Sequence, residues 1–175
     1  PIVFEIEKDI ERLELISDRF GKIGSTPQLT RSNPFTEIER MAAYMKLRSS
    51  KQVVIECTLP PDVFVMLSVP LFDWVLENLI KNALDATDGA GTIHIVASVQ
   101  NNLVSILISD TGKGMDSETA NQIFEPGFTT KKRGWGLGLP LSKRIMESYH
   151  HGKLFIKRTE LGKGTTFCLQ LPVVD

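Results

Sequence analysis

Two glycine clusters, each beside residues suited to nucleotide binding, carry most of the chemistry that this sequence suggests. The first is Asp110-Thr-Gly112-Lys-Gly114, which follows the apolar run Leu103 to Ile108 and so places a carboxylate at the end of an expected strand. A buried carboxylate there can accept a hydrogen bond from an exocyclic amine such as that of adenine, a charge-assisted bond worth about 1.5–3 kcal/mol. The two glycines tolerate backbone dihedrals that other residues avoid.

The second cluster, Gly134-Trp-Gly136-Leu-Gly138-Leu139, opens a segment whose pattern predicts an amphipathic helix over residues 137–148. Backbone N–H groups and the positive dipole end at such a glycine-rich helix N-terminus can approach an anion such as phosphate. Either cluster alone is a weak signal. Together with two asparagines upstream, they predict a nucleotide site.

These asparagines, Asn78 and Asn82, lie four residues apart on a helix expected over Leu71 to Ala86, so they share one face of it. Asparagine is a mediocre helix former with several hydrogen-bonding functions, and its amide oxygen is a hard ligand suited to Mg²⁺. A ligand on that face is therefore predicted. The alternative is two surface asparagines, which the glycine clusters downstream disfavour.

The polar stretch over residues 111–135 has little periodicity, which is typical of a lid over a site. Phe124 and Phe128 are expected to anchor this stretch. The basic triplet 131–133 is expected either to reach phosphates as the lid closes or to be solvated.

Two threonines and two cysteines lie in contexts that predict strands. Thr165 and Thr166 follow a Gly-x-Gly turn. We expect either that a threonine hydroxyl there supports Asp110, directly or through water, or that these threonines are plain strand residues. Cys57 and Cys168 are far apart in apolar surroundings, so we expect two buried thiols rather than a disulfide. No ligand spacing in the sequence suggests zinc.

Composition limits the function classes. A chain of 175 residues holds one domain with a proper core, and 42% hydrophobic with 23% charged residues is ordinary for a globular protein. A net charge of −1 disfavours nucleic-acid binding. No apolar run approaches the roughly 20 residues that cross a bilayer, and the N-terminus lacks a signal-peptide pattern. We therefore expect no nucleic-acid partner and no membrane contact by this chain.

The elements that must position these residues follow from periodicity and turn signals. Residues 35–50 predict a helix with Ile38, Met41, Ala42 and Met45 on one side, capped by Asn33 or Thr36. Further strands and hairpins are expected over residues 53–59 and 63–69, 92–99 and 103–109, and 153–159 and 165–171. Helices in one layer and strands in the other predict an α+β fold, a two-layer α/β sandwich with a mixed, largely antiparallel sheet.

The first segment is organised differently. Apolar residues recur at helical spacing from Ile6 to Ile23, and glycines, Ser25, Thr26 and Pro27 then break the pattern. The helix either packs on the domain or belongs to a bundle or dimer stem. We expect a boundary near residue 24, with a stem over 1–24 and the main domain over 25–175.

Five sequence elements, in order, resemble the catalytic and ATP-binding domain of sensor histidine kinases. They are the asparagine box from Glu77 to Ala83, the first glycine box at 110–114, Phe124-Glu-Pro126, the second glycine box at 134–139, and the Gly-Thr element at 162–165. The resemblance covers roughly residues 30 to 172. It implies the Bergerat-type ATP-binding fold shared with gyrase, mismatch-repair and chaperone ATPases.

The resemblance also implies roles and cofactors. ATP and Mg²⁺ are expected, with Asp110 on the adenine amine, Asn82 on the metal, and Asn78 near the phosphates. Asn78, Asn82 and Lys131 are the expected catalytic residues. Hydrolytic relatives carry a glutamate base where Asn78 stands, so this site resembles one that holds ATP for transfer. Nucleotide contacts are implied for Asn78, Asn82, Asp85, Asp110, Gly112, Gly114, Phe128, Thr129, Thr130, Lys131, Gly134, Gly136, Leu137, Gly138, Leu139 and Thr165.

The resemblance further implies partners that are not in this sequence. Residues 9–20 resemble the end of the second helix of the dimerisation and phosphoacceptor domain, and the acceptor histidine belongs on an upstream helix. A response regulator receiver domain, a homodimeric parent chain and a cytoplasmic location are implied. His94, His150 and His151 lack the acceptor context, so they are expected to be structural or solvated. This chain is then expected to bind ATP without phosphorylating itself.

Two positions depart from the family pattern, and two other functions stay open. Gly127 stands where many relatives have a bulky aromatic residue, and Trp135 stacks either on the lid or on the nucleotide. A free-standing protein-serine kinase or anti-sigma module is disfavoured by the stem-like helix at 6–23. A non-catalytic scaffold is disfavoured by the intact Asp110, Asn82 and glycines.

Overall fold

The computed structural model describes residues 27–131 and 134–175. The predicted stem helix at 6–23, the boundary near residue 24, and Lys132 and Arg133 of the basic triplet lie outside the described residues. The strands are β1 (Thr30–Ser32), β2 (Val53–Thr58), β3 (Val65–Leu67), β4 (Gly91–Gln100), β5 (Leu103–Asp110), β6 (Lys153–Glu160) and β7 (Gly164–Pro172). The helices are α2 (Pro34–Arg48), α3 (Val69–Thr87), α4 (Ser117–Gln122), α5 (Gly138–Arg144) and the π-helix η1 (Ile145–Tyr149).

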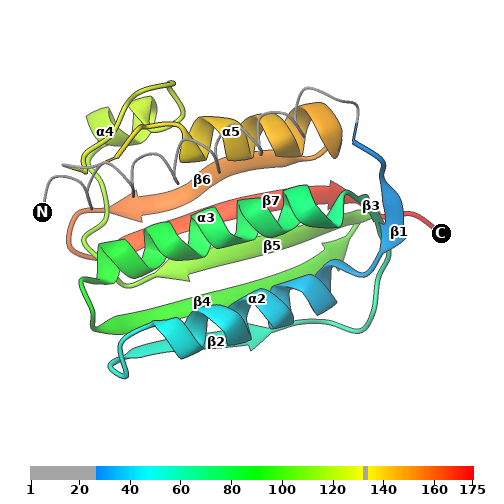
Figure 1. The fold of residues 1–175 in the computed structure, drawn as a ribbon, viewed down its shortest axis with the longest axis horizontal. Helices are drawn as coiled ribbons and strands as arrows, with labels where there is room; N and C mark the ends of the chain where they lie inside the picture. Colours follow the sequence, from blue (N-terminus) through cyan, green and yellow to red (C-terminus); the bar gives the residue numbers. More distant parts are fainter. Residues whose placement is uncertain (1–26, 132–133) are drawn as a thin grey trace, which may run out of the picture.

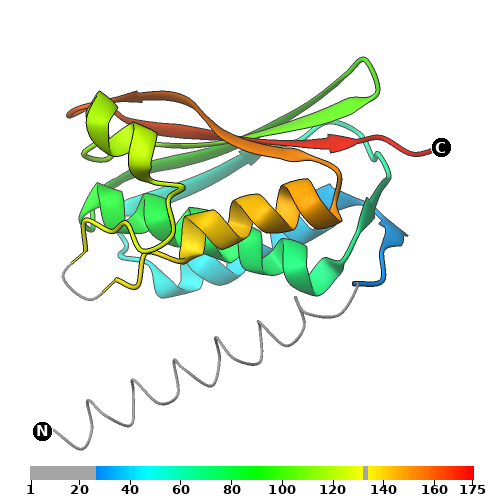
Figure 2. The same ribbon diagram turned by 90° about the horizontal axis from the view of Figure 1, so that it is seen from above.

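The described residues form two layers, with helices on one face of a mixed sheet (Figures 1 and 2). The strand order is β2-β4-β5-β7-β6, in which β2 pairs with β4 in parallel and the other neighbours are antiparallel. Alternate residues of the strands point at the helices, so Ile93, Ile95, Ile106 and Ile108 are buried. The predicted α+β sandwich with a largely antiparallel sheet is confirmed.

The hairpin of β4 and β5 determines where Asp110 lies. Gln100 pairs with Leu103 across a two-residue turn, and the turn residues Asn101 and Asn102 have φ of 51° and 58°. Positive φ at both turn residues is the type I′ pattern, whose twist suits two paired strands. The register of this turn puts Asp110 opposite Ile93 at the far end of a strand inside the sheet.

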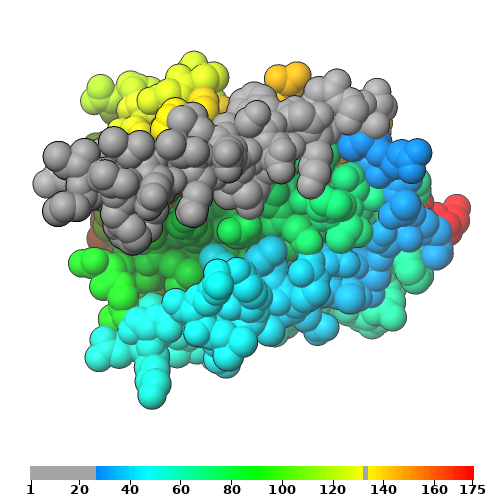
Figure 3. All heavy atoms as spheres, viewed as in Figure 1, coloured from blue at the N-terminus to red at the C-terminus, as the bar shows by residue number. Residues whose placement is uncertain are grey.

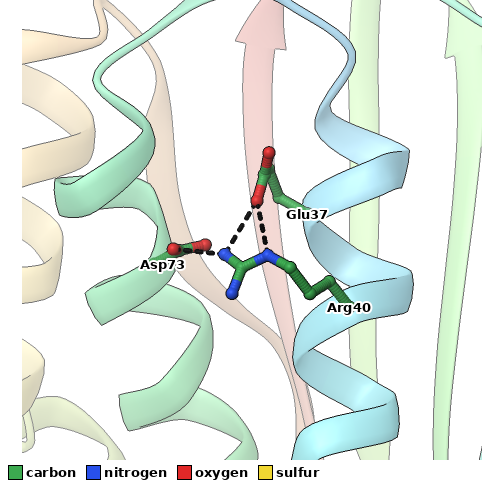
Figure 4. Close-up of polar contacts among 3 residues, drawn as sticks. All are labelled: Glu37, Arg40 and Asp73. Atoms are coloured by element: carbon green, nitrogen blue, oxygen red, sulfur yellow. Dashed lines mark hydrogen bonds and ion pairs between the residues drawn. The ribbon is translucent and has the colours of Figure 1, made fainter.

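Helix α3, which carries both asparagines, is held from two sides. Leu76, Leu79 and Ile80 are fully buried against the core. On the other side Arg40 of α2 donates to Glu37 at 2.8 Å and also bonds the Asp73 carboxylate of α3, so one guanidinium joins the two helices (Figure 4). Burial raises the pKa of Asp73, and the bond to Arg40 opposes that rise. Figure 3 shows α2 and part of α3 side by side on this face.

The capping of α2 follows the sequence. The side chain of Asn33 accepts a hydrogen bond from the Phe35 N–H at 3.0 Å, so Asn33 rather than Thr36 is the cap. The four residues predicted on the inner side of this helix, Ile38, Met41, Ala42 and Met45, are all buried.

Several expectations about the elements need correction. The two strands predicted over 53–59 and 63–69 exist as β2 and the shorter β3, of which β2 pairs with β4 and β3 pairs with β1 in a separate two-stranded sheet. The helix predicted over 137–148 is α5 followed directly by the wider turns of η1. Cys57 is exposed, because it lies on the edge strand β2, whereas Cys168 is buried as expected and both thiols are free.

No helix within the described ranges combines the length and the apolar character that crossing a membrane requires.

Candidate functional site

A cavity of about 670 Å³ lies over α3 and is lined by both glycine clusters. A volume of this size is typical of a small-molecule site. Its walls come from α3, the loop after β5, the segment 128–131, the stretch 134–141 and the start of β7. Residues from distant parts of the sequence therefore converge on one hollow.

Asp110 lies at the buried end of this cavity, with a fractional exposure of 8%. Its Oδ1 accepts the Gly112 N–H at 2.8 Å and the Thr165 N–H at 3.3 Å. Burial raises the pKa of Asp110, and the two N–H donors oppose that rise. With one oxygen held by the backbone, the other carboxylate oxygen is oriented by the chain itself, as recognition of a single donor group requires.

The loop around Asp110 is packed backbone against backbone. Gly164 has a φ of +94°, and a Cβ built there would collide with the carbonyl oxygen of Asp110. Gly162 N–H donates to the Lys113 carbonyl at 2.8 Å, and Lys113 N–H donates to the Ala86 carbonyl of α3 at 3.0 Å. The turn after β6 and the first glycine cluster thus form one rigid unit on α3.

The other end of the cavity is built around the two asparagines of α3. Asn78 donates through Nδ2 to Ser142 Oγ at 2.9 Å, and Ser142 is fully buried on α5. This bond joins α3 to the helix that follows the second glycine cluster. Asn82 instead receives a hydrogen bond at Oδ1 from Lys131 Nζ at 2.9 Å, and the same ammonium lies 2.5 Å from Asp85 Oδ2.

The stretch that contains Phe124, Gly127 and Gly136 is held in place by hydrogen bonds within it and by packing on the sheet. Gly127 N–H donates to the Gly136 carbonyl at 2.9 Å, and Gly136 has a φ of +64° at a place where a Cβ would collide with Gly127. Lys131 N–H donates to Thr129 Oγ1 at 3.1 Å. Phe124 packs edge-on against Phe167 with 6.5 Å between ring centroids.

Phe124 and Phe128 are both partly buried against the core, so the prediction that they anchor this stretch is confirmed. The stretch is less irregular than expected, because Ser117–Gln122 forms the short helix α4. Asp116 caps that helix by accepting the Thr119 N–H at 2.8 Å.

Nearly all of the sixteen predicted nucleotide contacts come together here. The cavity is lined by Asn78, Asn82, Asp85, Asp110, Gly114, Phe128, Thr129, Thr130, Lys131, Gly134, Gly136, Leu137, Gly138, Leu139 and Thr165. Gly112 does not line it, because this glycine packs against Ala86 and donates its N–H to Asp110.

The contact between Asp110 and Thr165 is made by the backbone, where a direct contact from a threonine hydroxyl was one of the alternatives. Thr165 supports Asp110 through its backbone N–H, while its hydroxyl bonds Thr159 Oγ1 at 2.9 Å and the Thr166 hydroxyl donates to Ser109 Oγ. The start of β7 brings the backbone, and not the side chain, up to the carboxylate.

The prediction missed several lining residues, among them Trp74, Lys81, Met115, Thr119, Ile123 and Phe167. Trp74 had a readable signal, since it precedes Asn78 by four residues and so shares its helix face. Trp135 also lines the cavity and is 48% exposed. Both tryptophans of the chain therefore border the hollow.

The histidines are structural or exposed. His150 is buried and accepts the Ser68 N–H at Nε2 at 3.0 Å, while its Nδ1 lies 3.0 Å from the Ile145 carbonyl, which requires a proton on Nδ1. Burial lowers the pKa of His150. His94 is exposed on β4 beside Glu56, and His151 is exposed.

Comparison with known proteins agrees with this geometry. The family model for histidine kinase-, DNA gyrase B-, and HSP90-like ATPases matches residues 69–175, well over half of the chain. Sensor histidine kinase ZraS of Escherichia coli K12 is 42% identical over 99 residues, which are 57% of this chain and 21% of ZraS. The chain thus spans about a fifth of that relative.

Solved structures share the fold. The catalytic domain of histidine kinase ThkA is 27% identical, with a TM-score of 0.71 over 83% of this chain and 95% of that one. A crystal structure of ThkA in complex with the response regulator TrrA has a TM-score of 0.78 at 24% identity, over 97% of this chain and 49% of that one, which is a likeness of fold. The chain belongs to the histidine kinase-, DNA gyrase B- and HSP90-like ATPase family, and within it is a catalytic and ATP-binding domain of the sensor histidine kinase type.

Proposed function

We propose that this domain binds ATP in the cavity over α3 and presents its γ-phosphoryl group to a histidine on a helix upstream of the described residues. The observation that carries the adenine assignment is Asp110, which lines the cavity and is buried, with Oδ1 held by two backbone N–H groups. Its second oxygen then accepts the exocyclic amine of adenine. A base that offers a carbonyl at that position would face a carboxylate and be rejected.

Transfer to a protein acceptor, rather than hydrolysis, fits the residues at the phosphate end. Asn78 is a neutral amide whose Nδ2 donates to Ser142, so it has no proton-accepting group to activate water. The residues beside the phosphates can therefore position them and balance their charge. Lys131 supplies the cation among the described residues of the segment 128–131.

Magnesium fits the oxygen atoms at this end. Asn82 Oδ1 and the Asp85 carboxylate are hard donors, and in the structure both already accept a cationic ammonium group. Asn82, with Asp85 beside it, would hold the ion. When bound, Mg²⁺ neutralises charge on the phosphates.

The partners are proposed from the relatives. The matched sensor histidine kinases are longer than this chain, and ThkA was crystallised with a response regulator. We propose that residues 1–24 are the end of a dimerisation and phosphoacceptor stem, that the parent chain is a homodimer, and that the phosphoryl group passes to a receiver domain. The location of the domain would then be cytoplasmic.

Calorimetric titration of this chain with ADP, with Mg²⁺ and with EDTA, tests the nucleotide site. We expect magnesium-dependent binding that Asp110→Asn weakens by about 10- to 150-fold, the equivalent of one charge-assisted hydrogen bond. No binding by the folded wild type would contradict the proposal. A longer chain with the upstream helix, incubated with labelled ATP, should then carry acid-labile phosphohistidine, whereas acid-stable phosphoserine would point to a serine kinase.

A further inference from the structure

The ammonium group of Lys131 bonds two of the oxygens best suited to a divalent cation. Its Nζ donates to Asn82 Oδ1 at 2.9 Å and lies 2.5 Å from Asp85 Oδ2. The two oxygens belong to residues three positions apart on one face of α3, and Lys131 approaches them from the segment that begins at Phe128. Nothing forces this pairing by proximity in sequence, since 49 residues separate Lys131 from Asn82.

This position of Lys131 is incompatible with a metal on the same atoms. Mg²⁺ binds oxygen at about 2.0–2.1 Å and demands nearly octahedral geometry. An ammonium already seated on Asn82 Oδ1 would occupy a coordination position and repel the ion, because both are cations on one oxygen. One of the two must leave when the other arrives.

Lys131 can leave at low cost. The side chains of Lys131 and Asp85 are each 46% exposed, so the ion pair is shared with water and contributes little to stability. Lysine is a flexible stem with a compact charge, which allows its Nζ to swing to a new partner while the backbone stays in place. The backbone of Lys131 is held by its N–H bond to Thr129 Oγ1 and by the Gly134 N–H, which donates to its carbonyl at 3.2 Å.

We propose that Lys131 is an exchangeable cation of the site, which occupies Asn82 Oδ1 and Asp85 Oδ2 until a divalent ion displaces it. This inference rests on the proposed function, and it assigns the metal dependence of nucleotide binding to a competition within the chain. Lys131 then sets how much of the metal's contribution to nucleotide affinity is spent on breaking a contact within the chain.

Two other lysines that line the cavity, Lys81 and Lys113, do not have this arrangement. Both are exposed, and among the described residues neither side chain has a hydrogen bond or an ion pair. They can add positive charge near a nucleotide, but they hold no metal-binding oxygen that an ion would have to take from them. Among the described lysines that line the cavity, the competition thus involves Lys131.

The test is the effect of magnesium on ADP affinity, expressed as the ratio of the Kd in EDTA to the Kd in saturating Mg²⁺. In Lys131→Met this ratio should rise by about 2- to 5-fold over the wild type, the equivalent of an exposed ion pair that the metal no longer has to break. The matched control is Lys163→Met, which removes an exposed lysine that pairs with Glu160 at the same 2.5 Å but does not line the cavity. The control should keep the wild-type ratio.

The double variant with Asp85→Asn keeps the inference testable if Asp85 is itself a metal neighbour. Lys131→Met should change the ratio less in the Asp85→Asn background, because the pair is already broken there. Thermal melts establish that each variant is folded.

Each other outcome has a distinct meaning. Equal weakening of ADP binding by Lys131→Met in EDTA and in Mg²⁺ would make Lys131 a plain phosphate ligand and overturn the exchange. An unchanged ratio with unchanged affinities would make it a surface ion pair and overturn it as well. Absence of ADP binding by the folded wild type in both conditions would instead overturn the proposed function itself.

Discussion

The two ends of the cavity over α3 are built in opposite ways. At one end Asp110 is 8% exposed, and two backbone N–H groups and a glycine packed against its carbonyl hold it in place. At the other end Asn82 meets Lys131, which also pairs with Asp85, and the side chains of this ion pair are each about half exposed to water. The first end is preorganised, so its specificity is set before the ligand arrives. The second end can change partners without disturbing the fold.

This contrast suits a site that must recognise one base and also position a phosphoryl group while it is transferred. Recognition of a single amine gains from a fixed, desolvated acceptor, since reorganisation would cost affinity. Positioning a phosphoryl group for a separate acceptor requires groups that follow charge as it moves. We therefore expect substitutions at the adenine end to act through structure and affinity, and those at the phosphate end to act through metal dependence.

The largest expected effect comes from adding one methyl group at Gly164, and the same addition at Gly127 is the comparison. Gly164→Ala should destabilise the domain by about 3 kcal/mol or more and abolish nucleotide binding, because its Cβ would collide with the Asp110 carbonyl in a backbone that cannot move aside. Gly127, which bonds the second glycine cluster through its N–H to the Gly136 carbonyl, also has a positive φ of +87°, but a Cβ there would meet nothing within 4 Å, so for Gly127→Ala we expect a loss of only about 1 kcal/mol. Chemical denaturation of both variants measures the difference.

Similar losses for the two variants would break the comparison. They would mean that the positive φ, and not the close backbone packing around Asp110, dominates at both positions.

A smaller effect separates affinity from stability at Asp110. In Asp110→Asn the amide oxygen can still accept the Gly112 and Thr165 N–H groups, and the amide nitrogen then faces the base. Burial raises the pKa of Asp110, so its protonated carboxyl group favours the folded state in acid, and that contribution is lost as the pH rises through the folded pKa. At neutral pH the neutral asparagine should leave stability equal or higher while ADP binding falls.

The same variant should narrow the preference for ADP over GDP, because an amide N–H can donate to the guanine carbonyl that a carboxylate repels. Parallel titrations with ADP and GDP, beside a thermal melt, measure both effects. A variant that loses stability together with affinity would show that Asp110 is chiefly a structural residue.

The parts of the site that could be predicted from sequence depend on local rules. Asp110 is the last residue of a mostly apolar strand, Asn33 caps α2 by accepting the N–H of Phe35 two residues later, and Asn101-Asn102 make a two-residue turn. In each case the residues that determine the conformation are neighbours in the chain, so type and spacing are sufficient.

The parts that could not be predicted depend on distant partners. β1 and β3 are three residues each and pair only because the fold brings them together. Cys57 has the apolar context of a buried thiol, but β2 is an edge strand. The Thr165 backbone, and not its hydroxyl, contacts Asp110 because the register of β7 on β5 decides which atom reaches the carboxylate. Lys131 meets Asn82 across 49 residues, and no local pattern encodes that distance.

The smallest expected effect is the pH dependence of the domain's stability that comes from the buried His150. His150 is buried and its pKa is lowered, chiefly by burial, with a smaller contribution from the neighbouring His151. The unfolded chain, with a pKa near 6.5, therefore takes up a proton more readily than the folded one, so stability is full above about pH 6.5 and falls as the pH falls. The slope is at most about 1.4 kcal/mol per pH unit for one proton.

Protonation of His150 would also set a new N–H of Nε2 against the Ser68 N–H at the start of α3. Denaturation between pH 7.5 and 5.5 should show this loss in the wild type and in His94→Gln, whose histidine is exposed, and a smaller loss in His150→Gln. An equal pH dependence in all three would assign the acid sensitivity to other groups and would remove His150 as the element that ties the buried start of α3 to the end of η1.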